Sequence, residues 1–165
     1  MTITQNPLNI VMGPPTVITL GGTDLGPELD GVVITFNQEV KEHTNDQSFA
    51  PVAYSLLKRT ADIVMTLTEA TLARVLTALN LAAASLSAST LTINDSIATA
   101  AQLIITGPSP TGSGSATRTY TFTKVMHVGS TDLAVGRDKP QHLALKFTAQ
   151  YDSTTSKIGT IVDAA

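Results

Sequence analysis

Hydrophobic and polar residues alternate along much of this chain, and a period of two residues predicts β-strands. In one such run Val32, Ile34 and Phe36 share a face, so this strand is expected to be half buried. The runs 52–57 and 59–67 alternate in the same way and are expected to pair as neighbours. The predicted strands are residues 17–20, 31–37, 52–57, 59–67, 91–93, 102–106, 119–123, 143–151 and 158–162.

A different period marks one helix. After Thr68 the apolar residues recur at spacings of three and four, which is the stripe of an amphipathic helix. Thr68 is a suitable N-cap, and Glu69 in the first turn suits the positive end of the helix dipole. Because one helix cannot bury its own apolar face, we expect a sheet to cover it. The stripe of this predicted helix, residues 69–79, is Leu72, Val75, Leu76 and Leu79.

Three segments follow neither period. Residues 1–15 are expected to form an N-terminal arm, and residues 107–115, with two prolines and three glycines, a flexible surface loop. Residues 38–50 are mostly polar, and we expect an exposed extension or long hairpin loop there. These segments therefore lie outside the predicted core.

The order of the elements indicates the fold class. Several strands precede the helix and more follow it, without the βα alternation of a doubly wound sheet. This order favours a mainly β fold, an antiparallel β-sandwich or barrel with one flanking α-helix. The 165 residues suffice for one domain, residues 1–165, and are too few for two of ordinary size.

Composition narrows the classes of function. Only 14% of the residues are charged, so much of the surface is neutral, and the frequent threonines suit exposed strand faces. The chain has no cysteine, no signal-peptide pattern and no apolar run long enough to span a membrane, so synthesis in a cytoplasm is expected. The net charge of -3 argues against ordinary nucleic-acid binding, which needs clustered Lys or Arg.

No catalytic, metal-binding or cofactor-binding residues are predicted. His43, His127 and His142 lie in three separate segments without the spacing of zinc ligands. Residues 21–26 are glycine-rich but lack the Gly-Lys-Ser/Thr ending of a phosphate loop, and turn glycines are the better interpretation. No nucleophile, base and orienting group can be assembled from these segments, so an enzyme is not expected.

Charge is unevenly distributed along the chain. A solvated acidic face explains the early carboxylates most simply, because no calcium-loop spacing is present. Opposite charges at the two ends also suggest a head-to-tail contact between identical copies, in which charge sets the register. The acidic residues Asp24, Glu28, Asp30, Glu39, Glu42 and Asp46 precede the basic residues Arg118, Lys124, Arg137, Lys139, Lys146 and Lys157.

Several segments together resemble phage tail tube proteins (major tail proteins). They are the strand 31–36, the polar extension with residues 46–48 and 51–52, the stretch 67–72 that enters the helix, and the closing segments 140–152 and 158–161. The resemblance covers most of the chain from about Val17 onward. The 107–115 loop matches no feature of that family.

The resemblance implies a structural, non-enzymatic role in a virion. Six copies would form a ring, rings would stack into a hollow tube, and DNA would pass from capsid to host cell through the lumen without specific binding. Partners would be other copies, a tail terminator, baseplate or tip proteins and a tape-measure protein. The termini would contribute contacts between rings, and the loop 38–50 would reach the adjacent ring through Gln38, Glu39, Lys41, Glu42, His43, Asp46 and Phe49.

Two other interpretations remain. A tail connector or terminator, or a secretion-system tube protein of the Hcp type, would share the fold but differ in stacking, since a connector stops at one ring. A monomeric β-sandwich binding module is more distant, because such modules usually present an aromatic platform and this chain has no Trp. Whether the purified protein forms tubes, single rings or monomers distinguishes the tube subunit, the connector or terminator, and the binding module.

Overall fold

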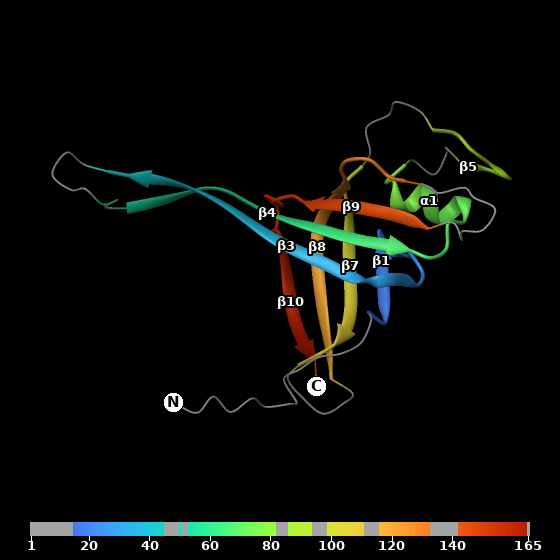
Figure 1. Cartoon of the computed structure of the whole chain (residues 1–165), viewed down its shortest axis with the longest axis horizontal. Coiled ribbons are helices and arrows are strands. Elements are labelled where there is room, and N and C mark those ends of the chain that lie inside the picture. The colour runs from blue at the N-terminus through green and yellow to red at the C-terminus, as the bar shows by residue number, and fades with distance from the viewer. Residues whose placement is uncertain are drawn as a thin grey trace.

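The structure is a computed structural model that describes residues 15–44, 50, 53–81, 86–93, 99–110, 116–132 and 142–164. Most of its elements are strands, and one short helix lies at one end (Figure 1). In chain order the elements are β1 (Val17–Leu20), β2 (Thr23–Asp24), β3 (Glu28–His43), β4 (Ala53–Leu67), α1 (Leu72–Ala78), β5 (Leu86–Ser87), β6 (Thr90–Leu91), β7 (Ala101–Pro108), β8 (Thr117–His127), β9 (Leu143–Ala149) and β10 (Gly159–Ala164).

Eight of these strands form one antiparallel sheet. Its order is β2-β1-β7-β8-β9-β4-β3, and β10 is added alongside β8. One edge of β8 pairs with β7. The other edge changes partner along its length, because residues 117–122 pair with β10 and residues 125–127 pair with β9. This branch lets the sheet fold back on itself, so that β3 and β4 cross the direction of β7, β8 and β10 (Figure 1).

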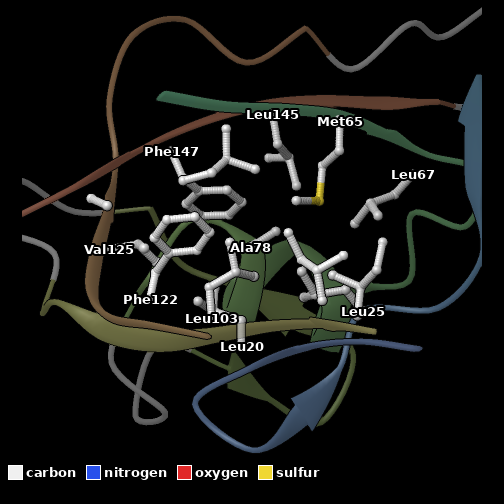
Figure 2. Close-up of a cluster of buried hydrophobic side chains, with 14 of the residues drawn as sticks. Leu20, Leu25, Met65, Leu67, Ala78, Leu103, Phe122, Val125, Leu145 and Phe147 are labelled. Atoms are coloured by element: carbon white, nitrogen blue, oxygen red, sulfur yellow. The ribbon is translucent and has the colours of Figure 1, made fainter. Parts of the chain in front are cut away.

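The hydrophobic core lies between the two layers of the folded sheet. Figure 2 shows Met65, Leu145 and Phe147, from β4 and β9, opposite Leu103 and Phe122, from β7 and β8. Each of these side chains is at most 2% exposed. Every second residue of β9 is buried, as the alternation in the sequence predicted. The predicted class, a mainly β antiparallel fold with one helix, is confirmed.

The helix is shorter than the predicted 69–79 and begins later. Thr71 is its N-cap, and the Thr71 side chain accepts a hydrogen bond from the Arg74 amide at 3.4 Å. Thr68, the predicted cap, instead donates both its amide and its hydroxyl to the Pro27 carbonyl at 3.1 Å. Those two bonds hold Thr68 at the end of β4, so the chain cannot enter the helix until three residues later.

The predicted stripe of the helix is only partly buried. Val75 is 8% exposed and Leu79 packs against the core, but Leu72 is 42% exposed and Leu76 is half-buried. Leu72 is the first residue of the helix, where the stripe already extends past the sheet. Glu69 precedes the helix and pairs with Arg74, so the expected acidic residue in the first turn is absent.

The runs 52–57 and 59–67 do not form two neighbouring strands. Both belong to β4, a single strand that pairs with β3 over almost its whole length. Glu39 is paired with Lys58 and Val40 with Leu56, so Leu57 is an extra residue on β4. Such a β-bulge changes the phase of the alternation within one strand, and this phase change is what suggested two strands.

Smaller differences occur elsewhere. The strand predicted over 143–151 ends at Ala149, and β7 continues to Pro108 into the predicted loop 107–115. The strand predicted over 91–93 is β6, which ends at Leu91, and β2 and β5 have too few residues for a periodic pattern. Residues 1–14, Asp46, Phe49 and 111–115 lie outside the described residues, as do the predictions made for them.

Candidate functional site

The distal half of the β3–β4 hairpin forms an arm that extends far beyond the rest of the sheet (Figure 1). We define the arm as residues 36–43 of β3 and 53–61 of β4, which are paired with each other throughout. All its described side chains are exposed except Thr60 and Ala61 at its root. An isolated two-stranded hairpin is at best marginally stable in water. The stability of the fold therefore does not explain the length of this arm.

One face of the arm is mainly apolar, and it also carries Gln38 and Arg59, which are hydrogen-bonded to each other at 2.8 Å. Directly paired residues on antiparallel strands project to the same face, and Phe36 is paired with Ala61, which is buried in the core. Beyond the bulge, Val40 is paired with Leu56. Phe36 and Leu56 line the same hollow, which confirms that they share this face. Val40, Tyr54, Leu56 and Phe36 are between 42% and 61% exposed.

The opposite face of the arm and of its root is polar. His43 Nε2 lies 2.7 Å from the Ser55 hydroxyl, and Asn37 donates to Asp62 at 3.3 Å. Asp62 also accepts a hydrogen bond from Thr148 at 2.8 Å. The hairpin is therefore amphipathic, with its apolar face continuous with the core and its polar face in water.

An open hollow lies where the arm leaves the core. Its volume is about 450 Å³, and Phe122, which is 2% exposed, forms part of its lining. It is thus the unfilled end of the space between the two layers of the sheet. The other residues around it come from the arm, from the turn before β10 and from β10 itself: Phe36, Leu56, Arg59, Tyr151, Ser156, Lys157, Ile158, Gly159, Thr160 and Ile161.

Strand β10 forms one wall of this hollow and has an open edge. Among the described residues it pairs only with β8, and Ile161 is 52% exposed. Arg118 fastens its far end through two bonds to Asp163, at 2.6 and 2.7 Å, and Asp163 also accepts from Ser109 at 3.0 Å. The bonds to Asp163, and then one to Tyr120, raise the pKa of Arg118 above its ordinary value.

A bonded carboxylate fixes the turn between β9 and β10. Asp152, 5% exposed, accepts hydrogen bonds from the Thr155 hydroxyl at 2.9 Å and the Thr154 amide at 3.2 Å, and pairs with Lys124 at 2.7 Å. The Lys124 bond, followed by the Thr155 bond, lowers the pKa of Asp152 to about 2. The Asp152 backbone also bonds to Lys157. This turn places Tyr151 and Ile158 at the hollow.

The histidines do not form a site. His43 is on the arm, and His127 ends β8, where its ring meets the edge of Phe147 with centroids 6.1 Å apart. Burial lowers the pKa of His127, so it is neutral in the fold at pH 7. Within the described ranges, no group of three His, Cys, Asp or Glu residues could hold a metal ion. No helix there is long and apolar enough to cross a bilayer.

The described part of the predicted 38–50 extension, residues 38–43, is the distal end of strand β3. Their backbone pairs with β4, and Gln38 and His43 also form side-chain hydrogen bonds to Arg59 and Ser55 of that strand. The apolar residues Val40, Tyr54 and Leu56 were not singled out from the sequence. The available signal was the alternation in 52–57, which places Tyr54 and Leu56 on one face, but the bulge at Leu57 hid that this face is continuous with that of 61–67. The predicted residues placed on β3 are Gln38, Glu39, Lys41, Glu42 and His43.

Comparison with known proteins gives a relationship of fold. No protein-family model matches the chain, and no curated protein matches its sequence. The chain is similar to a solved cryo-EM structure, the cap of the anti-feeding prophage, which is the tube-terminating cap of that particle. The alignment covers 94% of each chain with a TM-score of 0.54 and 10% sequence identity. The chain therefore has the fold of a phage-tail-like tube cap.

Proposed function

We propose that this chain is a non-enzymatic structural subunit of a phage-tail-like particle, and that copies of it form the ring that terminates the tube. The observation that carries the proposal is the fold match over 94% of both chains to a tube-terminating cap.

Unpaired strand edges support a ring. Among the described residues, no strand pairs with the outer edge of β3 or the outer edge of β10. Open edges promote aggregation in a monomer, whereas a closed ring of head-to-tail copies can cover one edge with the other on every subunit. A subunit with unpaired edges at both β3 and β10 is suited to such closure.

The cap role is preferred over the tube-subunit role that the sequence first suggested. The tube subunit stays as the second candidate, because the sequence resemblance to tail tube proteins covers most of the chain. Under either role the particle would be a virion or a virion-like tail. We expect six copies of the chain in each ring, and each copy would act as one domain. Other partners would be the tube below, tip or baseplate proteins, a tape-measure protein and DNA in the lumen.

Electron microscopy of the purified chain separates these roles. A cap subunit is expected to form single closed rings with a fixed number of copies, and to bind one end of tubes made from a separate tube protein. Long tubes formed by this chain alone would favour the tube-subunit role. A chain that stays monomeric at all concentrations would contradict both.

A further inference from the structure

We propose that the tip of the arm seats in the hollow of a second copy of this chain within the same ring. The contact would join the tip of one arm, at Val40 and Tyr54, to the gap beside β10 of the next copy, whose own Leu56 lines that gap. The inference rests on the proposed ring function and specifies which surfaces close the ring.

The arm supplies a face that lacks a second layer. In the core, the apolar face of β3 and β4 is covered by β7 and β8, but past Phe36 that cover ends. Beyond the polar pair of Gln38 and Arg59, apolar side chains resume on the same face at Val40, Leu56 and Tyr54. Tyr54 is 61% exposed and Leu56 53% exposed. Large exposed apolar side chains on one continuous face mark an interaction surface. The bulge absorbs the extra residue Leu57, so Tyr54 and Leu56 are still paired with Glu42 and Val40 on this face.

The hollow supplies the missing volume. At about 450 Å³ it can hold one large aromatic side chain with neighbouring aliphatic groups, and its exposed rim includes Tyr151 and Ile161, which are 60% and 52% exposed. It is already open to the buried Phe122. The side chain of an inserted Tyr54 would thus complete the apolar core of the neighbouring copy.

Charge favours the same pairing. Glu42 is paired with Tyr54 and so projects from the apolar face at the tip of the arm. Arg59 and Lys157 line the hollow. Seating one copy's arm tip in another copy's hollow brings a carboxylate to a basic rim, which sets the register of the contact. A head-to-tail contact of this kind closes into a ring when the rotation between copies allows it.

Engineered cysteines test the contact directly, because the natural chain has none. The full-length variants Tyr54→Cys and Ile161→Cys are purified separately, mixed under ring-forming conditions and oxidised. We expect a disulfide-linked dimer in the mixture and little in either variant alone. The double variant is expected to give a ladder of linked species that ends at the number of copies in the ring.

A matched control uses the opposite face of the arm. Ser55 is adjacent to Tyr54 but lies on the polar face beside His43. A mixture of Ser55→Cys with Ile161→Cys should cross-link at least about tenfold less than the Tyr54 mixture, since the two faces of a strand point in opposite directions. Equal cross-linking of the two mixtures, or linkage of Ile161→Cys to itself, would overturn the proposal.

Charge exchange gives a second, independent test. Lys157→Glu is expected to raise the concentration needed for ring formation about two- to fivefold, because an exposed ion pair contributes little. Adding Glu42→Lys on the same chain should return the concentration needed for ring formation to that of the natural chain. Failure of the exchange to restore assembly would count against the predicted register.

The outcomes distinguish this inference from the proposed function. Closed rings without the 54–161 cross-link would overturn the arm contact and leave the cap role intact. Cross-linking within long tubes would support the arm contact and contradict the terminal role. A chain that neither assembles nor cross-links at high concentration would overturn both.

Discussion

At the scale of single residues, Asp152 holds the turn that shapes the hollow. Its carboxylate is paired with Lys124 and bonded to Thr155, and its pKa is lowered from 3.8 to about 2. In the unfolded chain the carboxylate takes up a proton near its ordinary pKa, whereas in the fold it stays ionised to lower pH. The stabilisation is therefore fully present above about pH 4 and is lost as the pH falls through about 2.

Replacing Asp152 tests this dependence. We expect Asp152→Asn to be less stable than the natural chain at pH 7, with the difference in free energy of unfolding becoming smaller between pH 4 and pH 2. Lys124→Met, which removes the largest cause of the shift, should show a weaker form of the same trend. Urea unfolding at a series of pH values measures both, and a difference that stays constant with pH would contradict the assignment.

Asn80 is the second residue whose side chain decides local structure. It is 8% exposed, its amide group donates to the Thr99 carbonyl at 3.0 Å, and its oxygen accepts from the His127 amide at 3.2 Å. Its φ of 54° is in the left-handed region, which Asn and Gly tolerate better than other residues. It therefore ends the helix and ties it to β8.

Two substitutions at Asn80 separate these contributions. Asn80→Gly keeps the backbone conformation and removes both side-chain hydrogen bonds, to Thr99 and to His127, which together cost about 1–3 kcal/mol. Asn80→Ala loses the same bonds and adds backbone strain of roughly 1 kcal/mol. Thermal or urea unfolding should rank the natural chain above Asn80→Gly and Asn80→Gly above Asn80→Ala. Equal stability of the two variants would show that the backbone conformation is not strained.

At the scale of elements, the bulge in β4 absorbs one extra residue without changing which side chains lie on each face of the arm. Leu57 is the extra residue, so its deletion leaves Val40 opposite Leu56 and Glu42 opposite Tyr54. The apolar face would be kept, and only the local bend of the arm would change. Deleting Ser55 instead would move Tyr54 to the polar face, because a slip of one residue reverses the direction of a side chain.

The two deletions should behave differently in assembly. We expect the Leu57 deletion to retain cross-strand contacts between Val40 and Leu56 in nuclear Overhauser spectra and to retain some ring formation. The Ser55 deletion should abolish ring formation while leaving the core intact, as judged by thermal unfolding of the monomer. Loss of assembly in the first and not in the second would contradict the assigned faces.

At the scale of the whole molecule, folding and assembly are coupled. The hollow and the apolar face of the arm are exposed in a single copy and covered in the proposed ring. A partner that binds only the folded chain raises its apparent stability by mass action. We expect the midpoint of thermal unfolding to rise by several degrees between about 1 and 100 µM protein.

Replacing the two apolar residues at the arm tip provides the control. Tyr54→Ser combined with Leu56→Ser should remove the dependence on concentration and leave the midpoint at the value of the dilute natural chain, because both side chains are already exposed in the monomer. Calorimetry at matched concentrations measures this. A variant that keeps the full dependence would show that the arm contributes nothing to self-association.

Local pattern was sufficient for much of the fold. Residues 59–67 and 143–149 alternate without interruption, and both are strands with alternate residues buried in the core. The spacing of Val75 and Leu79 indicated a helix that packs on a sheet, as found. The mainly β antiparallel class followed from the order of these elements. Each of these features depends on neighbouring residues alone, because the periods of strands and helices are local properties of the backbone.

The tertiary structure decided what local pattern cannot express. Thr68 ends a strand because Pro27, distant in sequence, accepts its hydrogen bonds, and Leu57 is a bulge only in relation to the spacing of β3. The hollow requires that Phe36, Phe122 and Ile161, from three separate strands, meet at one open edge. Pairing between distant segments sets all of these features. A periodic pattern predicts which face of a strand is apolar, but it does not predict which segment packs against that face.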